Sequence, residues 1–507
     1  MRFLLKFFSF LIAVSLVALL GAYLLLRDAN NLKPELETLL SDQSGMDVTL
    51  GGDVRWVLLP PVELAMQNVT ARQDQQRINV ESLRLKVDIS AIWQDVNLWR
   101  VDALTLNNAS ITEGERETVV ESLNLTDFAL ATAAPFALQG NHRANAEATP
   151  LAFTVDGMLT YTPENETHRQ AVQISEANVS TEAAEGVCEI DLKDNPRTHP
   201  PLPPETADDI LPLATLMQYE LIADCTWQRV NLAEETFADV KTTLTNMGDA
   251  LNLYIEAPEF FSGQLISEVD VDLHARPIDW HVKPELNDVD SQKLLDWQQQ
   301  SFQWAALFAL HGELTLKGNT PDAFYQSVRA ETELDGGQGT LNIARLKQQL
   351  LTIAALTRQE TSIADWPDVW QYQEMLGTWR TRGQEQNFDF VLDHLTIDGG
   401  GKTDYANGTS DIRANVTFGP APEGNPYKVN DYLVDVPIPF RCRGATAELD
   451  CQLDDKAAQR IVARALTGSK DTGLRRKLEE KIEEDVPEEY RDAARNLLDI
   501  LGRALEQ

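Results

Sequence analysis

The chain has 507 residues, enough for one large domain or two to three ordinary ones, and 43% of them are apolar, which allows a sizeable core. Its formal net charge is −36, and a surface this acidic repels nucleic-acid phosphates and anionic lipid headgroups. Composition therefore argues against nucleic acid as a partner. The main consequence of the charge is solubility.

An apolar run without a charged residue, from Phe7 to Leu26, is long enough to cross a bilayer as a helix, at about 1.5 Å per residue and roughly 30 Å in all. Arg2 and Lys6 precede it, so the short N-terminus is expected in the cytoplasm and the rest of the chain beyond the membrane. A cleaved signal peptide is the alternative. Its apolar core is usually about 7–15 residues and ends at a small-residue cleavage site, which this run lacks. We therefore predict an uncleaved, single-pass anchor.

Four cysteines in an exported chain predict disulfides, and four cysteines allow three pairings. Cys442 and Cys451 lie close together and flank Gly444, which suits a pinned turn. That pairing leaves Cys188 with Cys225, on either side of a proline-rich stretch. Metal binding is the rival use, but the spacings contain no C-x2-C and no histidine lies near. We predict disulfides and no metal site.

The periodicity changes from helical to extended at about residue 46. An amphipathic helix is predicted from Leu32 to Gln43, with Pro34 near its start. Alternation then predicts a hairpin of strands 46–50 and 54–58, joined at a Gly51-Gly52 turn.

The clearest predicted strand is 83–89, where the apolar residues point one way and the charges the other. Further strands in this half are predicted at 101–106, 151–160 and 170–179. No fixed repeat period is visible, which argues against a propeller or a strict solenoid. A stiff, proline-rich linker follows at 195–205.

The second half mixes predicted helices and strands. Helices are expected at 208–221, 291–308, 341–358 and 365–382, and Thr320 is expected to cap another that has Pro321 at its first position. Strands are expected at 251–257, 269–273, around 314–316, at 388–398 and at 409–418. Gly399-Gly400-Gly401 is expected to be a flexible turn, and residues from Lys456 onward are expected to be helical.

The chain is thus predicted to be mainly β with additional helices, an α+β protein. The predicted domains are the N-terminus and membrane helix (1–27), a first β region (28–195), a linker and helix (196–222), a second β region with inserted helices (223–453) and a helical tail (454–507).

Catalytic constellations are absent from the sequence. The seven histidines show no metalloprotease spacing, and there is neither a nucleophile elbow nor a Walker-type phosphate loop. We predict no catalytic residues, no cofactor and no enzyme activity; a hydrolase is kept only as a third hypothesis.

Several segments resemble the AsmA-type proteins of Gram-negative bacteria. The most specific match is Gly45 to Ala71, GMDVTLGGDVRWVLLPPVELAMQNVTA, in which Leu50 replaces the usual isoleucine. Three looser matches follow in the family's order, at Leu211 to Leu232, at His311 to Leu346 and at Gly399 to Leu453. Together the four segments span most of the chain.

The resemblance implies an inner-membrane protein with its bulk in the periplasm, and a long curved antiparallel β-sheet related to the chorein-type bridge proteins. Its apolar groove would carry phospholipid acyl chains towards the outer membrane and so support outer-membrane biogenesis. The alternative is a periplasmic scaffold that regulates targeting and assembly of outer-membrane proteins, with proteins of the outer membrane or periplasm as partners.

The residues expected to line this groove are the apolar members of the alternating strands. They are Leu85, Val87, Ile89, Leu253, Ile255, Val269, Val271, Leu273, Phe390, Leu392, Val416 and Phe418. A charge introduced at Val87 or Val271 is expected to block transport. The identity of the lipid and the direction of its movement do not follow from the sequence.

Overall fold

The computed structural model describes residues 30, 33–44, 46–57, 62–73, 76–88, 100–114, 116–143, 145, 148–164, 169–196, 206, 208–357, 362–430, 433–446 and 448–453. The described chain is mainly β, as predicted. It divides into two compact units. Unit 1 comprises residues 1–207 and 212–248, and unit 2 comprises residues 208–211 and 249–507.

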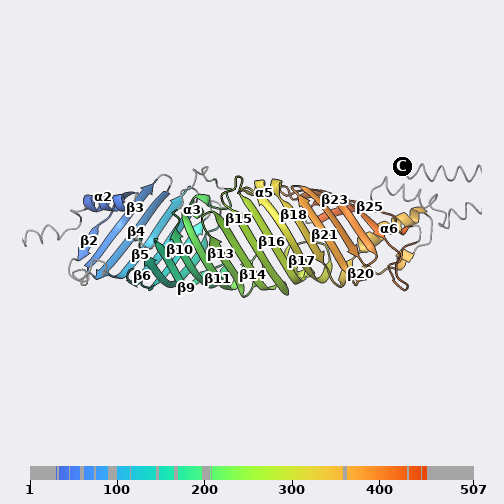
Figure 1. Ribbon diagram of the computed structural model, residues 1–507, viewed down its shortest axis with the longest axis horizontal. Coiled ribbons are helices and arrows are strands. Elements are labelled where there is room, and N and C mark those ends of the chain that lie inside the picture. The colour runs from blue at the N-terminus through green and yellow to red at the C-terminus, as the bar shows by residue number, and fades with distance from the viewer. Residues whose placement is uncertain are drawn as a thin grey trace, which may run out of the picture. The chain divides into compact units, whose positions relative to one another are not determined.

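Unit 1 is an antiparallel meander in which each strand from β3 to β10 pairs with the next, and β11 pairs with both β12 and β13 (Figure 1). The helices among its described residues are α2 (Lys33–Ser44) and α3 (Leu213–Gln218). Its strands are β1 (Asp47–Leu50), β2 (Val54–Val57), β3 (Val62–Gln73), β4 (Gln76–Asp88), β5 (Arg100–Glu113), β6 (Arg116–Phe128), β7 (Ala134–Arg143), β8 (Leu151–Thr162), β9 (Ala171–Thr181), β10 (Ala184–Asp194), β11 (Tyr219–Leu232), β12 (Glu235–Phe237) and β13 (Val240–Asn246).

The predicted hairpin at the start of the sheet is wrong. Strands β1 and β2 both pair with β3, and the backbone between them stays bonded to it, with Gly51 N donating to Asn68 O at 2.9 Å and Gly52 N to Gln67 O at 3.0 Å. A Cβ on Gly52 would lie 2.7 Å from Gln67 O. The two glycines therefore serve a close backbone approach along one interrupted strand, and they do not form a turn.

Helix α2 covers the end of unit 1 that β1 and β2 form. Leu36 and Leu40 pack on a cluster built around Leu50, Val54 and Met66. Side-chain oxygens of the helix also accept from the edge strand: Glu37 Oε1 from Leu50 N at 2.7 Å, and Ser41 Oγ from Val48 N at 3.0 Å. The helix thus satisfies backbone donors at a strand edge, a position where exposed N–H groups favour aggregation.

Left-handed residues keep the apolar side chains of unit 1 on one face. Met66 and Val69 join the same cluster although they are three residues apart, a spacing that places side chains on opposite faces of a regular strand. Between them Asn68 has a φ of 50°. Asn108 of β5 has a φ of 49°, and its amide donates to Glu81 Oε2 of β4 at 2.7 Å. At each kink the alternation of side chains slips by one residue, so the apolar residues before and after the kink stay on the same face of the sheet.

Unit 2 is also antiparallel, and β14 to β18 and then β21 to β26 pair in succession. A small second ladder joins the first residues of β17 to β19 and β19 to β20. The strands are β14 (Ala250–Phe260), β15 (Gly263–Asp272), β16 (Asp279–Asp290), β17 (Trp304–Lys317), β18 (Arg329–Asp335), β19 (Gly339–Asn342), β20 (Val369–Tyr372), β21 (Met375–Arg382), β22 (Glu385–Leu392), β23 (Leu395–Asp404), β24 (Thr409–Phe418), β25 (Ile438–Ala445) and β26 (Glu448–Leu453).

The described part of unit 2 contains the helices α4 (Ser291–Trp297), α5 (Pro321–Ser327) and α6 (Ala344–Thr357) and the 3-10 helix η3 (Ser362–Asp365). The predicted helix at 341–358 is confirmed as α6, and the predicted cap is confirmed because Thr320 Oγ1 accepts from Ala323 N at 3.3 Å.

Three other helix predictions are too long or wrong. The helix predicted at 208–221 is only α3, and the one predicted at 291–308 ends at Trp297, with β17 beginning at Trp304. Residues 365–382 form β20 and β21, where Trp370 and Tyr372 are buried on alternate positions of β20. The predicted membrane helix, the linker residues 197–205 and the helical tail lie outside the described residues. Within the described part of the chain, no helix combines the length and the apolarity that a membrane span requires.

Candidate apolar binding face

One face of unit 1 carries a continuous row of uncharged residues. We use "register row" for residues that lie directly opposite one another on successive strands, because such residues share a face. The central row runs from β2 to β9 through Val54, Met66, Leu83, Leu106, Leu123, Leu138, Val155 and Val179. The next row runs from β3 to β8 through Leu64, Leu85, Leu104, Leu125, Phe136 and Gly157. We call these rows the apolar face of unit 1.

The middle of this face is only half-buried by the residues that the structure describes. Leu83, Leu106, Leu123 and Leu138 are each half-buried, although they occupy the centres of their strands. Among the described residues, the adjoining hydrophobic cluster around Val101, Leu125, Phe128 and Ala134 draws its members from the neighbouring strands β4 to β8. These side chains are thus shielded by their neighbours in the same sheet.

Unit 2 has an equivalent face. One register row runs from β14 to β18 through Leu253, Val269, Val282, Leu314 and Ala330. A second runs from β14 to β25 through Ala257, Leu265, Leu286, Leu310, Leu334, Gly377, Phe390, Ile397, Val416 and Ile438. Neither row contains a charged residue, in a chain of which 24% is charged. We call them the apolar face of unit 2.

The opposite face of unit 2 is polar. Glu285, His311 and Glu333 occupy one register row there, on β16, β17 and β18. In the neighbouring row Arg380 Nε donates to Glu331 Oε1 at 2.9 Å, and this hydrogen bond raises the pKa of Arg380. Charge and apolar surface are therefore separated onto the two faces of the sheet.

The apolar face of unit 2 is covered at the end that holds β22 to β25. Side chains from α6, η3 and residues 427–436 pack there on strand residues Leu392, Leu395, Phe418 and Ile438. Trp370 stacks on Tyr427 with ring centroids 4.3 Å apart. We call this the closed core. Near β16 the face is covered locally, where Phe324 of α5 lies edge-on to Trp280 with centroids 5.2 Å apart.

The residues predicted to line a groove fall into three groups. Half-buried positions on strands are Leu85, Val87, Leu253, Ile255, Val269 and Phe390. Fully buried positions are Val271, Leu273, Leu392, Val416 and Phe418, the last three in the closed core. Ile89 lies outside the described residues.

Leu392, Val416 and Phe418 do not line an open surface, because other side chains of the closed core pack against them. Val271 is only 2% exposed, so a charge there would destabilise the fold instead of testing transport.

Sequence reasoning missed an aromatic group at the border of the closed core. Trp379 of β21 is 38% exposed and lies 5.4 Å, between ring centroids, from Phe388 of β22. The sequence predicts a helix at 365–382, whereas Trp379 lies on a strand directly opposite Phe388. Its indole Nε1 donates to Gln386 Oε1 at 2.6 Å.

The predicted cysteine pairing is confirmed. Disulfides join Cys188 to Cys225 and Cys442 to Cys451, and each pair lies directly opposite on adjacent strands. Two disulfides and no free cysteine fit a location outside the reducing cytoplasm.

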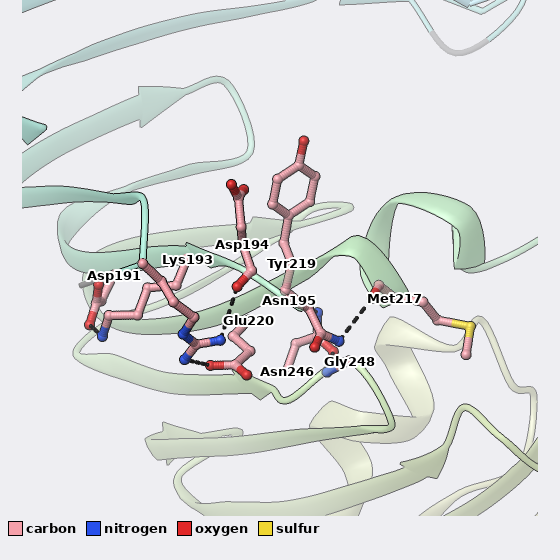
Figure 2. A network of polar contacts seen from close by, with 10 residues as sticks. Asp191, Lys193, Asp194, Asn195, Met217, Tyr219, Glu220, Asn246 and Gly248 are labelled. Carbon is pink, nitrogen blue, oxygen red and sulfur yellow. Dashed lines mark hydrogen bonds and ion pairs between the residues drawn. The ribbon is translucent and has the colours of Figure 1, made fainter. Parts of the chain in front are cut away.

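A network of polar contacts joins β10 to β11 and β13 beside α3 (Figure 2). Asn195 Nδ2 donates to Met217 O at 2.9 Å, and Asn246 Nδ2 donates to Leu216 O at 2.7 Å and to Tyr219 O at 2.9 Å. Arg169 bonds Glu220 at 2.5 Å, which raises the pKa of Arg169. Asn246 is 1% exposed and its amide bonds only to backbone carbonyls among the contacts given above, so this part of the network is a structural junction.

The part of the chain that the structure describes contains no group of three His, Cys, Asp or Glu side chains placed to hold a metal ion. Comparisons with known protein families, with curated proteins and with solved structures found no match.

Proposed function

We propose that this chain is a periplasmic, inner-membrane-anchored carrier of phospholipid, which holds acyl chains against the apolar faces of its sheets on their way towards the outer membrane. The observation that carries the proposal is the uncharged register row from Val54 to Val179 in unit 1. A soluble sheet normally buries such a face against a second layer.

The energetics favour acyl chains as the ligand. A two-chain lipid with roughly 30 methylenes loses on the order of 24 kcal/mol if its tails enter water, at about 0.8 kcal/mol per methylene. Contact with leucine and valine side chains removes most of that cost. The headgroup can stay in water, so no charged pocket is required, and an acidic polar face repels the anionic headgroups that would otherwise bind there.

The covered parts of the two apolar faces limit where lipid can lie. In unit 1 the middle of the face is half-buried, and α2 covers the end at β1 and β2. In unit 2 the row through Leu253 and Leu314 is half-buried, whereas the closed core excludes a ligand from Leu392 and Phe418. The disulfides support the extracytoplasmic location that such a carrier needs.

The test is mass spectrometry of the lipids that co-purify with the full chain. We expect phospholipid bound to the wild type and at least tenfold less bound to Leu106→Asp, which puts a charge into the central row. Asn107→Asp is the matched control, because Asn107 neighbours Leu106 but is an exposed residue of the other face. Leu314→Asp and Thr315→Asp repeat the comparison in unit 2. Near-ultraviolet circular dichroism verifies folding, and equal lipid in both members of each pair contradicts the proposal.

A further inference from the structure

The polar face of unit 2 carries a patch of exposed apolar side chains. Leu376 of β21 and Val391 of β22 lie directly opposite each other, and both side chains are 45% exposed. They line a hollow of about 490 Å³ together with Ala309 of β17. We call Ala309, Leu376 and Val391 the exposed patch. A patch of this kind, bordered by polar residues, is typical of a surface that another segment covers.

The border of the exposed patch is acidic. Glu333, Asp335 and Asp389 line the same hollow. His311 and Glu333 also line an adjoining hollow of about 480 Å³, in which Glu313 and Glu331 lie directly opposite each other. Lys283 lines the adjoining hollow and Arg380 already pairs with Glu331 and Asp389, so the attraction for a cationic occupant is centred on Glu333 and Asp335. The surface therefore fits a segment that is both apolar and basic.

Such a segment is present in the chain itself. Residues 456–477 contain seven Lys or Arg residues and a single acidic residue, Asp471, although the whole chain has a net charge of −36. The same segment has an apolar stripe at helical spacing, formed by Ala458, Ile461, Val462 and Ala465. It begins three residues after Leu453, the end of β26.

The connection is long enough for this segment to reach the exposed patch. Strands β26, β25, β24, β23 and β22 pair in succession, so β26 and β22 are about 19 Å apart at roughly 4.8 Å per strand. The chain from Leu453 to Ala458 extends over about 16 Å at roughly 3.3 Å per residue, and a helical turn from Ala458 to Ile461 adds about 4.5 Å at roughly 1.5 Å per residue, about 21 Å in all. The basic segment can therefore fold back over the polar face of its own sheet.

We propose that residues 456–477 dock on the exposed patch, with Ile461 and Val462 against Leu376 and Val391 and the arginines beside Glu333 and Asp335. The docked segment is an intramolecular strap on the polar face of unit 2. It leaves the apolar face untouched, so this inference does not depend on lipid binding.

Photo-crosslinking within the full chain tests the strap. Val391 is replaced by p-benzoylphenylalanine, and the adduct is mapped by peptide mass spectrometry. We expect adducts within residues 456–477. The control places the same residue at Leu232, an apolar side chain of unit 1 that is 46% exposed, where no such adduct is expected. Adducts only to lipid, only to another protein, or only between isotopically distinct copies of the chain overturn the proposal.

Charge reversal supplies a second readout. Arg460→Glu combined with Arg464→Glu is expected to lower the crosslink yield at least fivefold, and adding Glu333→Lys with Asp335→Lys is expected to restore it. Lys481→Glu lies beyond the docking segment and is expected to leave the yield unchanged. An unchanged yield in the double arginine variant, or a loss that the lysine substitutions do not reverse, overturns the proposal.

Discussion

Gly377 of β21 lies directly beneath the ring of Phe390 on β22: a Cβ added to this glycine would be 2.1 Å from Phe390 Cδ1. The pair belongs to the apolar face of unit 2, next to the closed core. Gly377→Ala is expected to lower the free energy of unfolding by about 1–3 kcal/mol, because the ring must leave its position.

The double variant Gly377→Ala/Phe390→Leu measures this coupling in a double-mutant cycle. We expect the smaller leucine to recover part of the loss from Gly377→Ala, measured by denaturant unfolding. Strictly additive effects of the two substitutions would show that the ring does not require the glycine.

The two disulfides are expected to differ in their contribution to stability. Cys188 and Cys225 are 37 residues apart, whereas Cys442 and Cys451 are 9 apart. Loop-closure entropy then predicts losses of about 4 and about 2.5 kcal/mol when each pair is replaced by alanine. Denaturant unfolding of the two double-alanine variants checks the order, and an equal or reversed order is the contrary result.

Alkaline pH is expected to weaken the closed core through Tyr372. Burial raises the pKa of Tyr372, the nearby charge of Asp393 raises it further, and the hydrogen bond from Trp304 Nε1, 2.6 Å long, acts in the opposite direction. Because the raised pKa favours the neutral phenol, its contribution to stability is complete below the ordinary tyrosine pKa of about 10 and is lost as the pH rises through the folded-state pKa.

Tyr372→Phe removes the acceptor of the Trp304 indole and is expected to lower stability by about 1–3 kcal/mol at neutral pH. The difference in free energy of unfolding between wild type and variant should become smaller above about pH 10, because only the wild type loses stability by ionisation of this residue. Unfolding titrations at both pH values measure this difference, and a difference that does not change with pH speaks against this role of Tyr372.

The stability of the polar network beside α3 is expected to depend mainly on the buried amide of Asn246 and much less on the ion pair of Arg169 with Glu220. Asn246→Ala leaves the carbonyls of Leu216 and Tyr219 without this donor, at a cost of about 2–3 kcal/mol. Arg169→Met breaks an ion pair whose arginine side chain is 41% exposed, and should cost below about 1 kcal/mol. Thermal unfolding compares the two; an equal loss would contradict this division.

The alternation of apolar and polar residues allowed many of the strands to be predicted, because it can be read from a few consecutive residues. It predicted β14 and β24 correctly. On β24 the alternate residues Ile412, Ala414, Val416 and Phe418 are all buried. It failed at β20 and β21, where tryptophan, methionine and leucine are dense enough to imitate a helix.

Other features depend on residues far away in the chain. Gly399-Gly400-Gly401 was expected to be a turn, yet it lies inside β23, and a Cβ on Gly399 would be 2.5 Å from Arg413 O and 2.7 Å from Phe388 Cζ. The closed core likewise needs contacts between α6 and strands of much later sequence. Such contacts decided which predicted groove residues became core, and the pattern along a single strand does not contain them.

The most direct test of lipid carriage is photo-crosslinking from the apolar face of unit 1 in living cells. The photoreactive residue is placed at Leu106 and, as the matched control, at Asn107 on the opposite face. We expect phospholipid adducts from position 106 and at least tenfold fewer from position 107. Adducts from position 106 that consist only of protein, from this chain or another, would contradict it.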